Sequence, residues 1–221
     1  MPLTLVLFDV DGTLVDSQAH IMLAMQVAFA DQGLDCPPRD AVLSIVGLSL
    51  AEAFRVLAPD QGEDRVQKLV EGYKDAFADA RMKNAAALSP LYPGARDCID
   101  ALARRDDYIF GISTGKSRRG LDHVLALHGL ENTFVTQQVA DFHPSKPHPS
   151  MAQTAMTETG ADRGVMIGDT TYDMEMGRAA GLKTIGVDWG YHRAADLRPM
   201  ADKVITSFAD LPRALTRIWG N

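Results

Sequence analysis

Two aspartates two residues apart are the first residues of this chain whose types could do chemistry. Asp9 and Asp11 follow the apolar run 3–8, and Gly12 and Thr13 come directly after them. The run is typical of a strand buried on both faces, so carboxylates at its end are costly unless something such as a cation compensates them. One carboxylate could attack phosphorus, while the other could protonate the leaving oxygen and later deprotonate water. Taken alone, the stretch could equally be a polar turn.

Three further polar residues stand where later strands or loops are predicted to end. Thr114 follows the predicted strand 108–112, and Asp169 follows the predicted strand 165–167. Lys146 stands in a loop between them. Because the carboxyl ends of the strands in a doubly wound sheet lie at one edge, these residues can converge on the paired aspartates.

The types of these residues suit phosphoryl transfer. Mg²⁺ prefers oxygen ligands and usually takes one or two carboxylates plus a substrate phosphate, which makes Asp9 and Asp169 candidate ligands. Lys146 would offset the negative charges of the phosphate and the nucleophile. The Thr114 hydroxyl and the amides after it could donate to phosphoryl oxygens. Singly, Thr114 or Asp169 could be a helix cap and Lys146 a solvated loop charge; their joint occurrence favours a catalytic site.

The segment 17–88 is predicted to be entirely helical. Apolar residues recur at helical spacing within 17–32, again just after Ser49, and a third time within 66–77. Ser49 and Glu52 form a capping-box pattern at the start of the second helix. The segment would emerge at the carboxyl side of the sheet, above the paired aspartates, where a lid belongs.

The remainder of the chain alternates between strand and helix patterns, which predicts an α/β fold with parallel strands and right-handed crossovers. The first strand, 3–8, joins this sheet. The other strands are predicted at 108–112, 133–136, 165–167, 183–187 and 204–205. The helical segment therefore interrupts an α/β core just after its first strand.

Composition restricts the classes of function. The 221 residues suffice for one ordinary domain plus a smaller one, and 46% hydrophobic with 23% charged residues is typical of a globular protein. A net charge of −7 without any basic run makes a nucleic-acid partner unexpected. The first apolar run is too short to span a bilayer and ends in aspartates, so neither a signal peptide nor a membrane anchor is expected. Cys36 and Cys98 lack metal-ligand spacing and favour a reduced, cytoplasmic protein.

The complete set of motifs resembles the haloacid dehalogenase-like hydrolase superfamily. The four matching stretches are Asp9-Val10-Asp11-Gly12-Thr13, Ile112-Ser113-Thr114-Gly115, Lys146-Pro147 and Gly168-Asp169-Thr170-Thr171-Tyr172-Asp173. The resemblance implies a Rossmann-like core with helices on both faces of the sheet, a Mg²⁺ cofactor and Asp9 as the nucleophile. It also implies that the Asp11 backbone carbonyl joins Asp9 and Asp169 around the metal. Asp173, together with Thr170, would not bind the metal directly but would hold the metal site or Lys146 in position.

A helical insert between the first and second motifs resembles the type-1 cap of this superfamily. The stretch Tyr92-Pro93-Gly94-Ala95 resembles the re-entry to the core in its phosphoglycolate phosphatase-like branch. We therefore expect a catalytic core formed by residues 1–16 and 89–221 and a cap domain at residues 17–88. The expected substrate contacts are Gly12, Thr13, Gly115 and Lys116 in the core, and Gly47, Ser49 and Arg55 in the cap.

The expected activity is Mg²⁺-dependent hydrolysis of a small phosphomonoester through an aspartyl-phosphate, by a monomer or homodimer. Asp11 argues against a dehalogenase, and the helix 17–32 lacks the lysine of a phosphonatase. The uncharged stretch 46–50 favours hydrolysis over transfer to a sugar. A phosphotransferase or phosphomutase and a catalytically silent binding protein stay open as alternatives. The identity of the substrate and the position of the cap also stay open. The same holds for any substrate contact made by His20, His143 or His148.

Overall fold

Six parallel strands form a single sheet in the order β3-β2-β1-β4-β5-β6. The computed structural model describes residues 2–220, except for the side chains of residues 81–87. In chain order the strands are β1 (Thr4–Phe8), β2 (Tyr108–Thr114), β3 (Thr136–Val139), β4 (Arg163–Gly168), β5 (Lys183–Val187) and β6 (Lys203–Ile205). The chain therefore has the predicted α/β architecture with a parallel sheet.

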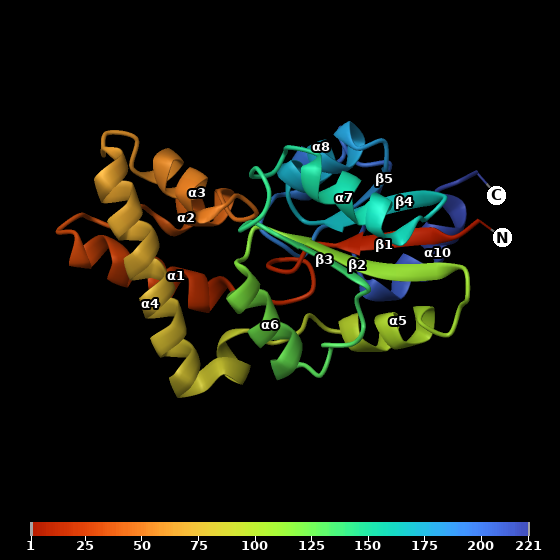
Figure 1. The fold of residues 1–221 in the computed structure, drawn as a ribbon, viewed down its shortest axis with the longest axis horizontal. Helices are drawn as coiled ribbons and strands as arrows, with labels where there is room; N and C mark the ends of the chain where they lie inside the picture. The colour runs from red at the N-terminus through yellow and green to blue at the C-terminus, as the bar shows by residue number, and fades with distance from the viewer. Residues whose placement is uncertain (1, 221) are drawn as a thin grey trace.

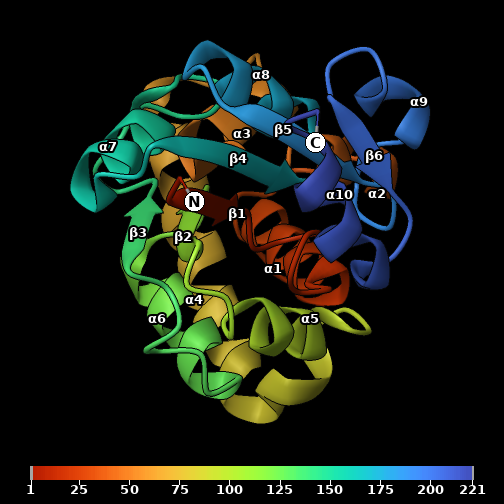
Figure 2. The ribbon, with the colours of Figure 1, turned by 90° about the vertical axis from the view of Figure 1, so that its right-hand side faces the viewer.

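Helices cover both faces of this sheet (Figure 2). One face packs against α5 (Ala95–Leu102), α6 (Arg118–Leu127), the 3₁₀ turn η1 (Phe208–Asp210) and α10 (Leu211–Arg217). The other packs against α7 (Ser150–Thr159) and α8 (Thr171–Ala179), and the short α9 (Ala194–Leu197) follows β5. In β1, Val6 and Phe8 enter the first core while Leu5 and Leu7 enter the second. Burial on both faces explains why β1 is a continuous apolar run.

The position of β1 places the paired aspartates at the centre of one sheet edge. Phe8 lies opposite Ile112 of β2 on one side and Ile167 of β4 on the other. The residues that follow these three strands therefore emerge beside one another, where ligands of such sheets usually bind.

The remaining helices lie together at the carboxyl side of the sheet (Figure 1). They are α1 (Gln18–Asp31), α2 (Arg39–Ser44), α3 (Leu50–Leu57) and α4 (Glu63–Leu88). We call residues 17–88, which contain them, the helical insert. Phe29, Phe54 and Tyr73 belong to a hydrophobic cluster of the insert that is separate from the two cores of the sheet. Phe54 is completely buried and meets the Tyr73 ring edge-on at 6.2 Å.

The two connections of the insert run side by side. Val15 and Leu91 form an antiparallel bridge. The Asp16 amide donates to the Pro90 carbonyl oxygen, and the Tyr92 amide donates to the Leu14 carbonyl oxygen, each at 2.9 Å. The insert thus leaves and re-enters the core at one point, next to the end of β1.

Most predicted elements occur with shifts of one or two residues, but the strand predicted at 133–136 was wrong. β3 begins at Thr136 and is largely polar, whereas Phe134 turns into the core and Val135 is 67% exposed. The two apolar residues Phe134 and Val135 suggested a strand, but only Phe134 is buried. The short helices α2 and α9 were not predicted. Within residues 2–220, no helix combines the length and the hydropathy needed to cross a membrane.

Candidate active site

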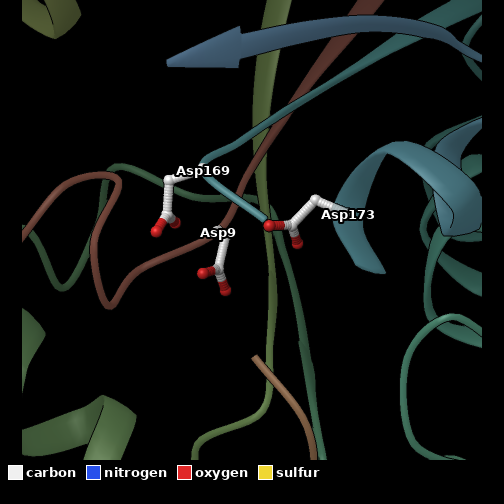
Figure 3. Close-up of side chains that lie close together, drawn as sticks. All are labelled: Asp9, Asp169 and Asp173. Carbon is white, nitrogen blue, oxygen red and sulfur yellow. The ribbon is translucent and has the colours of Figure 1, made fainter. Parts of the chain in front are cut away.

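Three carboxylates meet at the carboxyl edge of the sheet (Figure 3). Asp9 follows β1, Asp169 follows β4, and Asp173 lies in the first turn of α8. One oxygen of each lies within 4.8 Å of the others, and all three residues are buried. Lys146 Nζ donates to Asp9 Oδ1 at 2.9 Å and to Asp173 Oδ1 at 2.6 Å. The fold thus brings residues of the first, third and fourth motifs together.

This buried cluster has too little positive charge, because three carboxylates face the single ammonium group of Lys146. Burial raises the pKa of Asp9 to about 7, although Lys146 opposes the shift. Burial also raises the pKa of Asp169 well above its ordinary value, with Asp173 and Asp9 adding to the effect. Burial disfavours the charge on Lys146, but Asp173 and Asp9 outweigh it and raise the pKa of the ammonium group. Without a further cation, the raised pKa values of Asp9 and Asp169 therefore drive these two carboxylates towards protonation.

One oxygen of Asp9 indicates what completes the cluster. Asp9 Oδ2 is buried and has no hydrogen-bond partner among the described residues. Such an atom is costly unless another group binds it. A hard divalent cation such as Mg²⁺ prefers carboxylate oxygens, and its two charges would balance the two excess negative charges of the cluster. The donor set of the site therefore fits a magnesium ion.

Asp169 is fixed by groups from two other loops. Thr13 Oγ1 donates to Asp169 Oδ1 at 2.9 Å, and the Tyr191 amide donates to Asp169 Oδ2 at 2.8 Å. Two glycines permit this approach: a Cβ on Gly12, whose φ is +84°, would lie 2.2 Å from Asp169 Oδ2, and one on Gly190 would lie 2.2 Å from Asp169 Cβ. Gly12 and Thr13, predicted as substrate contacts, thus lie against Asp169.

Asp173 and Thr170 form a capping box at the start of α8. Thr170 Oγ1 donates to Asp173 Oδ2 at 2.6 Å, while the other carboxylate oxygen accepts from Lys146. A Cβ on Gly168 would lie 2.3 Å from Asp173 Cγ, so only glycine fits there. Because Thr170 caps this helix, the alternative role of Asp169 as a helix cap is excluded.

The Asp11 carboxylate lies apart from this cluster and binds a different lysine. Lys116 Nζ donates to both Asp11 oxygens, at 2.8 and 2.7 Å, and Ser17 Oγ donates to Asp11 Oδ1 at 2.5 Å. Ser17 Oγ also lies 3.0 Å from the Tyr191 hydroxyl. Lys116 stands 5.0 Å from the centre of the Phe77 ring on α4. Asp11 therefore sits at the junction of the core and the helical insert.

The loop after β2 touches the insert directly. The N-cap of α6 is Ser117, so Thr114 is not the helix cap that it could have been. Thr114 Oγ1 instead accepts a hydrogen bond from the Lys116 amide at 3.2 Å. A Cβ on Gly115 would lie 2.6 Å from the Leu48 carbonyl oxygen and 2.7 Å from that of Gly47. The insert is thus seated on the core at Gly115.

A cavity of about 90 Å³ lies between the core and the insert. The core contributes five of the predicted residues to its lining: Asp9, Asp11, Thr114, Gly115 and Lys116. The insert contributes Gly47 and a set of apolar side chains from α1, α3, α4 and the loop 45–48. Lys74 and Arg119 also line it, and neither was predicted.

Four residues predicted to contact substrate lie outside this lining: Gly12 and Thr13 of the core, and Ser49 and Arg55 of the insert. The exposed Arg55 side chain pairs with Glu52 and Glu63. The amide of Ser49 donates to Ser145 Oγ at 2.8 Å, and its side chain makes no capping hydrogen bond, so the predicted capping box is absent. Arg55 thus uses its charge in ion pairs within the insert, and Ser49 contacts the core through its backbone amide.

The three histidines left open by the sequence also lie outside the cavity lining. His20 is buried and stacks on Phe77, with ring centroids 3.4 Å apart. His143 lies between Ser150 and Gln138, at 2.8 and 2.9 Å. His148 accepts from the Ser150 amide at 3.2 Å. Each has a structural contact that accounts for its position.

We expect that replacing Gly115 by alanine will push the insert away from the core. The new Cβ would collide with two backbone carbonyls, which cannot swing aside as a flexible side chain can. The Ser49 amide would then lose its bond to Ser145 and should exchange its hydrogen at least about tenfold faster. Hydrogen exchange followed by mass spectrometry or NMR measures this.

Gly120→Ala is the matched control for this prediction, because its Cβ would approach nothing closer than Ser117 Oγ at 3.3 Å. Exchange at Ser49 should be unchanged in that variant. Equal exchange rates in both variants would show that the insert is not held at Gly115.

The chain resembles known proteins over nearly its whole length. The family model described as haloacid dehalogenase-like hydrolase matches residues 6–187. A protein of Dickeya dadantii named as a probable phosphatase, IndB, is 35% identical over 91% of this chain and 88% of its own. A phosphoglycolate phosphatase of Haemophilus influenzae is 27% identical over 92% of this chain and 94% of its own.

A solved haloacid dehalogenase-like family hydrolase from Streptococcus pneumoniae has the same fold, with a TM-score of 0.82 at 22% identity, covering 96% of this chain and 98% of its own. The family match spans all four motifs around the buried carboxylates. The chain therefore belongs to the haloacid dehalogenase-like hydrolase family, as an enzyme of its phosphoglycolate phosphatase-like branch.

Proposed function

We propose that this protein hydrolyses small phosphomonoesters with the help of Mg²⁺ and through a phosphoryl group carried by Asp9. The observation that supports this most is the buried Asp9 carboxylate, which has one oxygen bonded to Lys146 and the other without a partner in the described part of the chain. A carboxylate so placed can act as a nucleophile once its charge is balanced. Mg²⁺ would be held by Asp9, Asp169 and the Asp11 carbonyl, and when bound it would neutralise charge on the phosphate.

The reaction would then proceed in two displacements by residues of the chain. In the first, an Asp9 oxygen forms a bond to phosphorus, the bond from phosphorus to the alcohol oxygen breaks, and Asp11 gives that oxygen a proton. In the second, Asp11 takes a proton from water, whose oxygen attacks phosphorus and displaces the Asp9 carboxylate. Inorganic phosphate leaves, and both aspartates return to their starting forms.

Lys146 and Thr114 would hold the groups in place during these steps. Lys146 keeps the Asp9 carboxylate oriented and, through Asp173, ties it to α8. Thr114 lines the cavity and can donate its hydroxyl to a phosphoryl oxygen. Lys116, Gly115 and the neighbouring amides offer further donors on the same side of the cavity.

The helical insert would act as a cap domain that contacts the organic part of the substrate. Its residues form the wall of the cavity opposite Asp9, and its two connections lie side by side at Val15 and Leu91. A segment attached at one point can move as a unit and shield the reaction from bulk water. Gly47 lines the cavity, so changes there should affect different esters differently.

A panel assay tests the proposed function directly. Purified protein is incubated with a series of phosphomonoesters and Mg²⁺, and released inorganic phosphate is measured. Steady release over many turnovers, absent after Asp9→Asn, supports hydrolysis. Transfer of the phosphoryl group to an added alcohol without release would favour a phosphotransferase, and phosphorylation that stops after one event would refute turnover.

We expect Mg²⁺ to stabilise the fold as well as to support activity. An ion that binds only the folded state stabilises it by about 2.7 kcal/mol at one hundred times its dissociation constant. The melting temperature should therefore rise with Mg²⁺ and saturate, while Asp169→Asn should lose most of the shift. Magnesium-independent melting together with full activity in EDTA would contradict the proposed metal site.

A further inference from the structure

The wall of the cavity formed by the insert is almost entirely apolar. Its main side chains are Ile21, Met25, Ile45, Leu50, Tyr73 and Phe77. Four of them, namely Ile21, Met25, Ile45 and Tyr73, are buried in the separate cluster of the insert. Phe77 is held in position by the stacked His20 ring. These side chains cannot turn away to expose polar groups behind them, so the apolar character of this wall is fixed.

The cations that line the cavity are either paired with an aspartate or exposed to solvent. Lys116 is bound by both oxygens of Asp11. Lys74 and Arg119 are exposed, and neither makes an ion pair within residues 2–220. A second anionic group on the substrate, placed between Asp11 and the apolar wall, would therefore lose its hydration and could pair only with a solvent-exposed cation, which contributes little.

The size of the cavity limits what else can enter. Its volume of about 90 Å³ is less than that of a cavity of roughly 150 Å³ that accommodates benzene. The insert is seated on the core at Gly115 and through the bond of the Ser49 amide to Ser145. With the insert in this position, the space beside Asp11 suits a few carbon atoms rather than a sugar or a nucleoside.

From these observations we propose that the preferred substrates are monoesters of phosphate with a short, uncharged, mainly apolar alcohol. Esters whose alcohol carries a carboxylate, such as 2-phosphoglycolate, are then poor substrates. This rests on the proposed phosphatase activity and specifies its substrate class. The recognition element is the apolar wall of the insert, because Lys116 beside Asp11 is already paired with that carboxylate.

One pair of substrates, one series of three substrates and one pair of variants test this proposal. Isobutyl phosphate and 2-phosphoglycolate have nearly the same shape, but only the second carries a carboxylate. The value of kcat/KM should be at least about tenfold higher for isobutyl phosphate. Going from methyl to ethyl to propyl phosphate should raise kcat/KM about fourfold per methylene, the gain for burying one such group.

Leu50→Lys places a cation in the lining and should move the preference towards 2-phosphoglycolate by at least about tenfold. Val56→Lys is the matched control: it adds the same charge to the same helix at a position that is 57% exposed and outside the lining. That control should keep the original preference.

The outcomes separate this inference from the proposed function. No phosphate release from any ester, in any variant, would refute the phosphatase itself. Release with 2-phosphoglycolate equal to or better than isobutyl phosphate would leave the phosphatase standing and overturn the apolar substrate class. A shift in preference that is the same for Leu50→Lys and Val56→Lys would overturn the role of the cavity wall.

Discussion

Replacing Asp9 by asparagine should reduce phosphate release to less than about 10⁻⁴ of the original rate, because an amide is a poor nucleophile. The substitution should leave the fold intact. Asparagine has the same shape, and its carbonyl oxygen can still accept the hydrogen bond that Lys146 now donates to Asp9 Oδ1. The measurement is the single-turnover rate of phosphate release, alongside the melting temperature of both proteins.

A second readout does not depend on turnover. Beryllium fluoride imitates a phosphoryl group bound to a carboxylate, so it should stabilise the original protein in the presence of Mg²⁺ and fail to stabilise Asp9→Asn. If the variant loses only about 1.4 kcal/mol in barrier, or roughly a factor of ten in rate, Asp9 is not the nucleophile.

Replacing Asp11 by asparagine should lower kcat about 10²- to 10⁴-fold for alkyl phosphates, because their leaving oxygen needs a proton. The loss should be much smaller for p-nitrophenyl phosphate, whose leaving group departs without one. The two substrates are compared in the same pair of proteins by steady-state kinetics. The contrast between them isolates the acid role from general damage to the site.

Asp16→Asn is the control for this second prediction. Asp16 lies five residues further along the chain, accepts a hydrogen bond from the Gln18 amide and lies outside the cavity lining. Its replacement should change both substrates little. Equal losses for the alkyl and nitrophenyl esters in Asp11→Asn would assign Asp11 a purely structural role, such as holding Lys116.

The sequence predicted the fold where a single pattern determines the element. The apolar run before Asp9 is typical of a strand buried on both faces, and Gly168-Asp169 marked the end of another. The prediction failed at β3, which is an edge strand of the sheet. Its residues Thr136, Gln137 and Gln138 are polar and give no apolar strand pattern. The position of β3 is set by its pairing with β2 and by the hydrogen bonds that the buried Thr136 and Gln138 side chains donate to Glu158.

The sequence identified the core residues of the candidate site better than its surroundings. Asp9 and Asp169 were recognisable because a charge at the end of a buried strand is unusual, and Lys146 was recognisable because it occurs together with them. The contact between Lys116 and Asp11 was not foreseen, since the two residues are 105 positions apart in the sequence and only the fold brings them together. Tyr191 offered a signal that could have been used: Gly190 before it follows the end of β5, at the same sheet edge.

The residues of the insert that line the cavity were hard to identify from the sequence for a related reason. Arg55 and Ser49 were singled out because they are polar, yet the cavity wall is built from residues that resemble an ordinary core. In an apolar pocket, the side chains that meet a ligand and those that hold helices together have the same chemistry. The two groups differ only in where they lie in the fold, which the sequence does not show directly.

The antiparallel pairing of Val15 with Leu91 makes the insert an exchangeable module. The chain before and after the insert forms the stem of a hairpin, and the whole insert is its loop. The entropy of closing a loop grows only slowly with its length, so a stem that is already hydrogen-bonded tolerates loops of very different sizes. A different helical insert could therefore be grafted between residues 16 and 90 without disturbing the sheet, giving the same reactive centre a new selectivity.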